Sequence, residues 1–493
     1  MVKKMKRKRL KKQMKKKSIK FFLLFGIIIS LVFIMGLYHI YKPLPKGLSF
    51  EGQIFNVSEE NIEFLYDLTY ENKDGEIVHQ QEIFDKIFET IDNAERFVLI
   101  DMFYWKEGKE ESSRNLGEEL VRHLVERKKK FPDIKIVVIT DPLNTCYNSF
   151  ELSFFQELKN NNIPLIFTNL DKLRDGKVIY SPIWRTFFWI WGEPGRGWIQ
   201  TPLFTEKISI KSFLKLLNFK SNHRKVAIID CKNKICSFVI SANPSGGDVD
   251  NSNVGILVKE ELYKDLYETE KSILKMSNFE LEDWDFDFVE KDENEKDIQV
   301  QLLTEGKIKE NLIRELNQVE KGDKIKIAMF FLSDRDIIES LLEASEIGVD
   351  IELVVDPNKH SFGRPNYGIP SRIVIEELIK KSNGKIKARF YNTHNEQFHS
   401  KIIIIVKKDK IIIFIGSSNL TRKALKDFHL ETNVKITSGK EKEFAKEILE
   451  YFELIYTNKG GDKYTLDTSY FEPSSLFRKM KYRFQEATGT GTF

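Results

Sequence analysis

The sequence predicts two tandem, similar α/β/α domains with mostly parallel mixed sheets, related by a pseudo-twofold axis and preceded by one transmembrane helix. Three observations predict this fold. The chain begins with a basic tail and a long apolar run, the remainder contains the same ordered set of motifs twice, and short apolar runs alternate with segments of helical spacing. With 493 residues, the chain is long enough for two or three domains.

The N-terminal region has the composition of a membrane anchor. Residues 1–20 contain twelve Lys and Arg and no acidic residue, and the run from Phe21 to Ile40 carries no formal charge over 20 positions. As a helix this run would span roughly 30 Å, the thickness of a bilayer core. A secretory signal has a shorter apolar region and a small-residue cleavage site, which "YHIYKPLPKG" does not offer. We expect a single-pass cell-membrane protein whose N-terminus is cytoplasmic and whose remainder is extracellular.

The remainder of the chain repeats itself. The first half contains "RFVLIDMFYW", "IKIVVITDPLN", "NHRKVAIID" and "ISANP", and the second contains "IKIAMFFLS", "VDIELVVDPNK", "FHSKIIIIV" and "IGSSNL". Each apolar run is short and rich in Ile and Val, as buried strands are. Because segments of helical spacing separate the runs, we expect largely parallel sheets covered by helices.

The repeats and the charge pattern set the expected domain boundaries. An acidic stretch from Phe279 to Asp297 has the charge of a solvated linker, although its aromatic side chains can dock, and the C-terminal end has the composition of a partly disordered tail. We expect a basic cytoplasmic tail at 1–20, a transmembrane helix at 21–41, domain 1 at 42–285, an acidic linker at 286–300, domain 2 at 301–457 and a C-terminal tail at 458–493.

Each half places a histidine and a lysine two residues apart at the head of an apolar run. These pairs are His223 with Lys225 and His399 with Lys401. Alternate side chains of a strand share a face, so each pair points one way while Arg224 points the other. A single histidine is more often structural than catalytic, but two copies at matching places in a repeat argue for a shared role.

An asparagine follows each histidine by twenty residues, at Asn243 and at Asn419. The apolar run before each asparagine would pair with the histidine strand through a hairpin. We therefore expect the histidine, lysine and asparagine of both halves to meet at one strand end.

The strings "HRKVAIID" with "SAN", and "HSKIIIIV" with "GSSN", resemble the paired H-x-K-x4-D and G-S-x-N motifs of the phospholipase D superfamily. The resemblance covers Ile83 to Tyr456 and implies that each half contributes one motif to a single active site. It is less specific for substrate, because the superfamily includes phospholipases, cardiolipin and phosphatidylserine synthases, and nucleases. Because members mostly use the N-terminal histidine as nucleophile, the resemblance assigns His223 that role and His399 the acid/base role; the reverse order is the alternative.

These side chains are sufficient to split a phosphodiester. Two imidazoles can serve as nucleophile and general acid across one phosphorus, and the two lysines and two asparagines can donate to its nonbridging oxygens. One histidine would form a phosphohistidine, and the other would protonate the departing alcohol and then activate water or an acceptor alcohol.

Further residues are candidates for supporting or phosphate-binding roles. Glu431 matches an acid that often follows G-S-x-N in this superfamily, where a carboxylate would fix an imidazole tautomer; a solvated surface glutamate is the alternative. In the first half Asn251 holds the aligned place, with Asp248 and Asp250 close by. The full set of supporting candidates is Asn243, Asn419, Asp230, Glu431, Ser241 and Ser417.

The second motif lacks its aspartate. The first copy ends in Asp230, whereas the fifth residue after Lys401 is Val406. An aspartate seven residues along a strand from its histidine lies roughly 23 Å away, so we interpret it as structural. Its loss predicts an asymmetric site that is still catalytic.

We predict no metal and no cofactor, because the sequence has no histidine or cysteine ligand spacing and a lysine beside each histidine would repel a cation. Cys231 and Cys236 bracket the turn "CKNKIC" and are either a cross-strand disulfide or reduced hairpin residues.

The predicted substrate is a phospholipid in the bilayer. Four of the six tryptophans lie from Trp184 to Trp198, either as a flap on the membrane or packed on the protein itself. Beyond residue 20 there are 66 basic and 74 acidic residues, a balance of −8, so we do not expect nucleic acid as a partner. We predict a membrane-anchored, phospholipase D-like hydrolase or phosphatidyltransferase of the cardiolipin-synthase kind. An anchored nuclease and a weakened phosphate- or lipid-binding protein are the alternatives; head group, acceptor and oligomeric state are left open.

Overall fold

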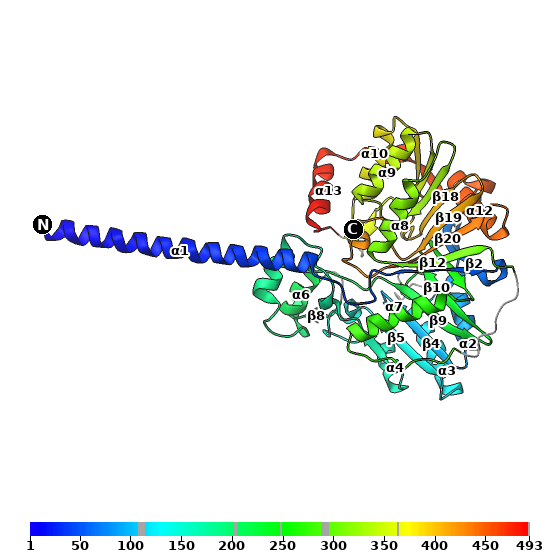
Figure 1. The fold of residues 1–493 in the computed structure, drawn as a ribbon, viewed down its shortest axis with the longest axis horizontal. Helices are drawn as coiled ribbons and strands as arrows, with labels where there is room; N and C mark the ends of the chain where they lie inside the picture. Colours follow the sequence, from blue (N-terminus) through cyan, green and yellow to red (C-terminus); the bar gives the residue numbers. More distant parts are fainter. Residues whose placement is uncertain (107–113, 202–204, 247–248, 287–294, 362–363, 492–493) are drawn as a thin grey trace.

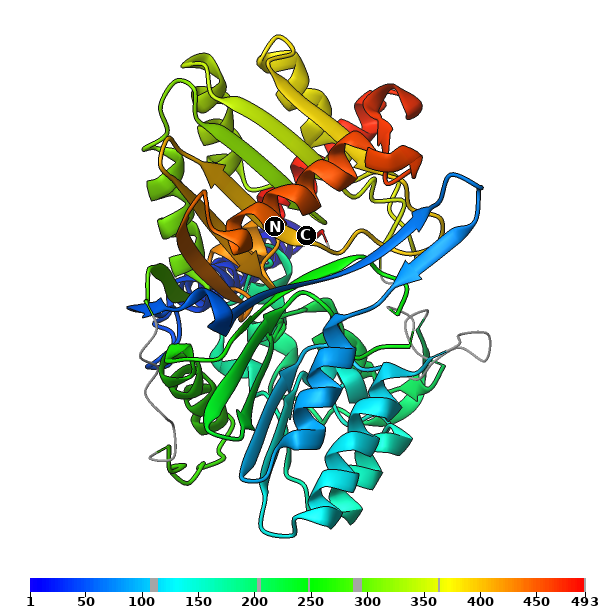
Figure 2. The ribbon, with the colours of Figure 1, turned by 90° about the vertical axis from the view of Figure 1, so that its right-hand side faces the viewer.

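Two α/β bodies lie against each other, and one long helix projects from them (Figure 1). The structure is a computed structural model that describes all residues except 107–113, 202–204, 247–248, 287–294, 362–363 and 492–493. In Figure 2, where the long helix points away from the viewer, the first half of the chain forms the lower body and the second half the upper one.

The first sheet is built from the first half of the chain. Its strand order is β3-β2-β11-β10-β9-β4-β5-β6. Its strands are β2 (Ile62–Glu71), β3 (Ile77–Gln80), β4 (Phe97–Met102), β5 (Lys135–Thr140), β6 (Leu165–Phe167), β9 (Lys225–Cys231), β10 (Lys234–Ile240) and β11 (Asn253–Val258).

The second sheet repeats this order, since β20-β19-β18-β13-β14-β17 corresponds to β11-β10-β9-β4-β5-β6. Its strands, from edge to edge, are β1 (Glu51–Val57), β12 (Ile298–Thr304), β20 (Thr432–Gly439), β19 (Lys410–Gly416), β18 (Lys401–Val406), β13 (Lys324–Met329), β14 (Asp350–Val355), β17 (Ile386–Tyr391) and β21 (Thr465–Asp467). Two small hairpins pair β7 (Arg196–Gln200) with β8 (Lys207–Ile208) and β15 (His360–Ser361) with β16 (Arg364–Pro365).

Helices cover both sheets. The α-helices are α1 (Val2–Tyr41), α2 (Ile83–Asn93), α3 (Leu116–Lys130), α4 (Ser153–Asn160), α5 (Tyr180–Ile183), α6 (Ile210–Leu217), α7 (Leu262–Met276), α8 (Gly306–Leu316), α9 (Arg335–Glu346), α10 (Ser371–Lys381), α11 (Arg422–Leu425), α12 (Glu443–Thr457) and α13 (Leu476–Thr488). The π-helical turn η4 is Trp184–Phe188, and the 3₁₀ turns are η1 (Glu59–Asn61), η2 (Pro142–Thr145), η3 (Leu170–Lys172), η5 (Lys459–Gly461) and η6 (Thr468–Tyr470).

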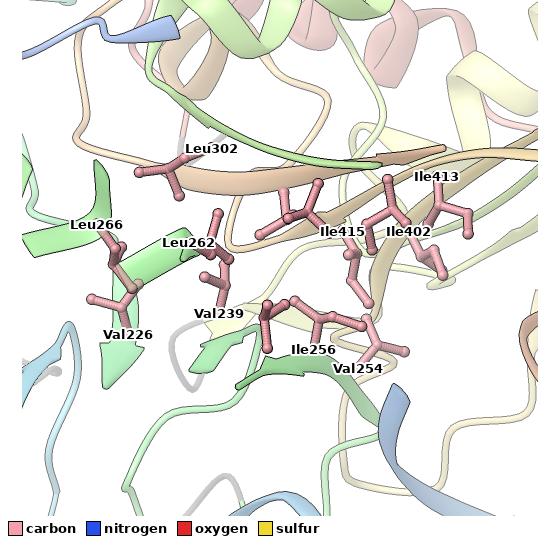
Figure 3. Packing of buried hydrophobic residues seen from close by; sticks show 14 of the residues in the cluster. Val226, Val239, Val254, Ile256, Leu262, Leu266, Leu302, Ile402, Ile413 and Ile415 are labelled. Carbon is pink, nitrogen blue, oxygen red and sulfur yellow. The ribbon is translucent and has the colours of Figure 1, made fainter. Parts of the chain in front are cut away.

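The core has three layers of apolar side chains. One outer layer packs α2, α3 and α4 on the first sheet, and the other packs α8, α9 and α10 on the second. The central layer joins the inner faces of both sheets with α7 and α12. Figure 3 shows this layer, where Val254 and Ile256 of the first half lie near Ile402 and Ile415 of the second. The two halves therefore share one core.

The predicted α/β fold with two similar mixed sheets is confirmed, but the expected excess of parallel pairs is wrong. Among the described strands, parallel pairing is limited to β4–β5–β6 and β13–β14–β17. The strand after each histidine returns through a tight turn, and a tight turn can only make an antiparallel pair.

The ends of the predicted domains also differ from the expectation. Strand β1 precedes the whole first sheet yet pairs with β12 of the second. The C-terminal segment is not a disordered tail over its described length, because β21 joins the second sheet and α13 buries Tyr482 completely. Residues 287–294 of the predicted linker lie outside the described residues, while Trp284 before them docks on Phe97. The boundary between the domains stays a prediction.

Helix α1 contains the whole predicted basic tail and apolar span. By length and composition it can cross a membrane, with a mean hydropathy of 2.6 in its most apolar window. Its C-terminal end packs on α5, and a Cβ at Gly36 would lie 2.7 Å from the Pro182 ring. The backbone amide of Asp175 donates to the His39 carbonyl over 3.0 Å. The helix therefore leaves the folded part at a fixed place.

Candidate active site

The two histidines immediately precede equivalent strands, His223 before β9 and His399 before β18. The Lys225 ammonium donates to the carbonyl of His223 over 2.8 Å, and the Lys401 ammonium donates to that of His399 over 2.6 Å. Both lysine side chains are fully buried. Each predicted pair therefore forms one unit in which the lysine holds the backbone of its own histidine.

Each imidazole is hydrogen-bonded to a side chain of the opposite half. His223 Nδ1 lies 3.0 Å from Glu431 Oε2, and His399 Nδ1 lies 3.1 Å from Asn253 Oδ1. The backbone repeats this exchange, because the His223 amide donates to the Leu430 carbonyl and the His399 amide to the Ser252 carbonyl. The two halves thus build one composite site.

Asn253 replaces Asn251 as the first-half counterpart of Glu431. The sequence alignment chose Asn251, whose side-chain oxygen instead accepts the Gln397 amide over 2.8 Å. The segment from Ser241 to Asn253 is two residues shorter than the segment from Ser417 to Glu431. This length difference shifted the alignment of the two halves. Asp248 lies outside the described residues, and Asp250 pairs with His79.

The two candidate serines stand behind the histidine partners. Ser241 donates to Asn253 Oδ1 over 3.0 Å, and Ser417 donates to Glu431 Oε2 over 2.5 Å. Each serine oxygen also accepts a backbone amide of the following strand. In this structure the serines therefore orient the partners of the imidazoles.

The G-S-x-N turn needs its glycine. Gly416 has a φ of +155°, and a Cβ there would lie 2.2 Å from the Thr432 carbonyl. The close approach seats Ser417 against β20. Asn419 Oδ1 accepts the Phe331 amide over 3.3 Å, and Asn243 is buried at the matching turn of the first half.

Two buried aspartates, one from each of the repeated strings "IKIVVITDPLN" and "VDIELVVDPNK", hold the chain before each histidine. Asp141 accepts the Asn222 amide over 2.7 Å, and Asp356 accepts the Phe398 amide over 2.8 Å. Burial raises the pKa of each carboxyl to about 7. Their recurrence in the repeat was the signal for this role.

Burial and neighbouring charge keep both imidazoles neutral. Burial, then the positive charges of Lys225 and Lys401, lowers the pKa of His223 well below its usual value. The same causes lower the pKa of His399, while the carbonyl of Ser241 acts in the opposite direction. Burial raises the pKa of Glu431 to about 8, against the opposing effect of Lys225. At neutral pH Glu431 is therefore protonated, while His223 is a neutral imidazole.

Asp230 lies at the far end of β9 from His223. Its carboxylate accepts the backbone amides of Glu95, Arg96 and Phe97, which lead into β4. In the second half the turn before β13 is closed by the Asp323 carboxylate, which accepts the Glu320 amide. This arrangement gives a structural reason for the absence of an aspartate at Val406.

Arg224 points away from the two pairs, as predicted, and joins the halves. Its guanidinium donates to Glu270 over 2.9 Å and to Glu305 over 2.7 Å, with all three side chains fully buried. Glu305 also accepts the Glu431 amide over 3.1 Å. The network supports the backbone that presents Glu431 to His223.

Over the described residues, no group of three or more His, Cys, Asp and Glu side chains is arranged to hold a metal ion. The two cysteines at the β9–β10 turn, Cys231 and Cys236, form a disulfide.

Comparisons with known proteins agree with the fold. Residues 312–456 match the family described as "Cardiolipin synthase, PLD-like domain". Phosphatidylserine synthase of Haemophilus influenzae is similar in structure, with a TM-score of 0.55, 13% identity, and coverage of 92% of this chain and 97% of that one. No curated protein matches in sequence.

Two further solved structures are more distant. A polyphosphate kinase of Porphyromonas gingivalis has a TM-score of 0.47 and 13% identity, over 86% of this chain and 53% of that one. The phospholipase D family member Nuc of Salmonella typhimurium has a TM-score of 0.26 and 22% identity, over 34% of this chain and 99% of that one.

The fold and the composite site define a class of protein in which two similar α/β halves each contribute a histidine–lysine pair to one shared site. Residues 312–456 match a phospholipase D-like family of the cardiolipin synthase type, and the fold of the whole chain is similar to that of phosphatidylserine synthase.

Proposed function

We propose that this chain is a membrane-anchored enzyme that hydrolyses phospholipids or transfers their phosphatidyl group through a covalent phosphohistidine, without a metal ion. The observation that carries the proposal is the exchange of imidazole partners, Glu431 to His223 and Asn253 to His399. An imidazole bonded at Nδ1 presents Nε2 to a substrate, and two such imidazoles in one site supply an attacking and a protonating group.

In the proposed reaction the negative charge of the bound phosphodiester raises the pKa of His399, which takes up a proton on Nε2. His223 Nε2 then attacks the phosphorus, and the bond to the departing alcohol breaks as His399 gives that proton to the alcohol oxygen. Water or an acceptor alcohol then attacks the phosphohistidine while His399 takes its proton, and the phosphorus–nitrogen bond breaks. Lys225, Lys401 and the side-chain amides of Asn243 and Asn419 are the proposed donors to the nonbridging oxygens.

A phospholipid is favoured over nucleic acid by what surrounds the site. Helix α1 can hold the folded part at a bilayer, and the family matched by residues 312–456 is of the cardiolipin synthase type. The aromatic insertion, defined as residues 180–200, packs on the C-terminal end of α1. Trp184 is buried, but Trp189, Trp191 and Trp198 are 47%, 68% and 72% exposed. This exposure favours contact with the outer leaflet over packing on the protein itself.

The purified full chain, incubated in turn with labelled phosphatidylglycerol and single-stranded DNA, with and without EDTA, tests the proposal. We expect release or transfer of the phosphatidyl group, unaffected by EDTA, and no DNA cleavage. Cleavage of DNA alone would replace the lipid assignment with the nuclease alternative, and loss of activity in EDTA would exclude the metal-free mechanism.

Variants test the assigned roles. His223→Ala is expected to abolish both turnover and the acid-labile phosphoenzyme, whereas His399→Ala is expected to lower turnover by about 10²-fold or more. The exposed His360, outside the site, gives the matched control His360→Ala. A phosphoenzyme that persists in His223→Ala and disappears in His399→Ala would reverse the two roles.

A further inference from the structure

The C-terminal helix α13 packs with its polar and apolar sides reversed relative to a helix of a soluble protein. Leu476, Phe477, Met480 and Phe484 are 75%, 76%, 63% and 58% exposed. At 3.6 residues per turn these four side chains fall within an arc of about 100°. A helix on a water-exposed surface normally turns such an arc toward the core, so this arc requires another explanation.

The remaining sides of α13 are tied to the second half of the chain. Tyr482 is fully buried and its hydroxyl donates to the Ser333 carbonyl over 3.4 Å. Lys479 pairs with Glu376 over 2.9 Å, and Arg483 pairs with Glu377 over 2.9 Å. These contacts fix the rotation of α13, so the exposure of its apolar arc is a property of the fold.

Three basic side chains flank the apolar arc: Lys481 on one side, and Lys479 and Arg483, which are paired with Glu376 and Glu377, on the other. The segment Leu476–Thr488 contains Arg478, Lys479, Lys481 and Arg483 and one acidic residue, Glu486. An apolar face bordered by Lys and Arg is the pattern of a helix that lies in the interface of an anionic bilayer.

The position of α13 identifies the occupant of this face. In Figure 1, α13 lies at the end of the long axis from which α1 projects. Thr488 of α13 accepts the Val178 amide over 3.0 Å, just before the aromatic insertion, and the same insertion packs on α1. Three exposed apolar elements, α1, the insertion and α13, thus gather at one end of the protein.

We propose that α13 is a membrane-surface helix that lies in the headgroup region of an anionic bilayer beside α1. This inference rests on the bilayer anchoring proposed above, and it adds a second, C-terminal contact that is independent of the reaction. Helix α13 also bears on the site, because Arg422, three residues after Asn419, donates to the carbonyls of Glu486 and Ala487. Docking of α13 would therefore hold the G-S-x-N turn toward the lipid surface.

Fluorophore labels on introduced cysteines of the full chain test the contact. Cys146 is buried and Cys231 and Cys236 are disulfide-bonded, so only the new cysteine is open to the reagent. The test position is Phe477→Cys; Ile29→Cys in α1 is the control for immersion, and Lys129→Cys on α3 is the control for solvent exposure. The chain is reconstituted in vesicles of phosphatidylcholine with or without phosphatidylglycerol, and quenching by lipids with a quencher on the acyl chain is measured.

We expect the label at 477 to be quenched several-fold more than the label at 129, and more strongly when phosphatidylglycerol is present. Quenching at 29 but not at 477 would overturn the α13 proposal while the anchor stands. Absence of quenching at both 29 and 477 would overturn the anchoring as well.

Charge and apolar surface are tested separately. Lys481→Gln is combined with the label at 477, and the quenching gives the ratio of molecules with α13 on the bilayer to molecules with α13 off it. We expect this change to lower that ratio about fivefold on anionic vesicles and to leave it unchanged on neutral ones. A triple change, Leu476→Ser with Met480→Ser and Phe484→Ser, should lower turnover in vesicles at least several-fold while turnover of a short-chain lipid in detergent is kept. Equal loss in both assays would indicate a folding defect and overturn the interfacial role.

Discussion

Glu431 and Asn253 occupy equivalent places but differ in charge, and this difference makes the site asymmetric. Each bonds Nδ1 of the opposite half's histidine, and each is oriented by a serine hydroxyl. Only the glutamate can lose a proton, so only His223 has a titrating partner. This asymmetry supports His223 as the nucleophile, because a carboxylate stabilises the Nδ1–H tautomer that leaves Nε2 free to attack.

The pH dependence of turnover should therefore depend on Glu431. Below its pKa of about 8 the protonated carboxyl donates to Nδ1 and leaves the proton of the imidazole on Nε2; above that pKa the carboxylate accepts from Nδ1–H and Nε2 becomes nucleophilic. We expect kcat/KM to rise with pH until about 8. In Glu431→Gln, turnover should fall by about 10²-fold and the rise near pH 8 should disappear.

The control for this experiment is Glu441→Gln, an exposed glutamate outside the site, which should keep the wild-type profile. The converse change, Asn253→Asp, places a carboxylate beside His399 and should raise the pKa of that imidazole. A Glu431→Gln enzyme that kept the same rise would show that another group controls the nucleophile.

At the scale of elements, the two histidine strands differ at their far ends. Strand β9 ends in Asp230, which binds three backbone amides of the chain entering β4, whereas β18 ends in Val406. In the second sheet, the backbone entering β13 is held instead by the turn at Glu320–Asp323. The motif aspartate thus joins two elements and does not reach the imidazoles.

Asp230→Val is expected to lower the free energy of unfolding by about 3 kcal/mol, because it leaves one buried and two partly buried backbone amides without their acceptor. The protein that remains folded should keep its turnover. Val406→Asp should not raise activity. Denaturant unfolding of the full chain in detergent gives the free energy of unfolding, and an activity assay gives the turnover per folded molecule. A Val406→Asp enzyme that gained orders of magnitude in rate would assign the aspartate a direct role in the reaction.

The sequence predicted elements well where local pattern determines them. The apolar runs became buried strands, and the equal twenty-residue spacing placed each asparagine at the turn beside its histidine strand. The sequence did not predict structure that depends on contacts between distant segments. Nothing local in "EGQIFNV" indicates that β1 crosses to the second sheet, and the reversed face of α13 has the periodicity of an ordinary helix. Asn253 was missed because a two-residue length difference lies inside the repeat.

At the scale of the whole molecule, the halves are held together by more than the site. Apolar side chains of both sheets pack in one central layer, and Arg224 of the first half pairs with Glu305 at the start of the second. A buried ion pair is costly to break, about 3–5 kcal/mol when one partner is removed. Since Glu305 also binds the Glu431 amide, the contact that joins the halves also positions the partner of His223.

Because both halves of the site come from one chain, two inactive chains should not restore each other. His223→Ala and His399→Ala each remove one member of the same site, and exchange of a half between chains would require opening the shared core and the pairing of β1 with β12. When the two full-length variants are produced together in one cell, we expect activity no greater than the sum of the separate variants. The control co-produces wild-type chain with His223→Ala and should give activity in proportion to the wild-type share. Recovery of activity by the two variants would mean that the site is completed between two chains, and that the exchange of histidine partners within one chain is one of two arrangements that the fold allows.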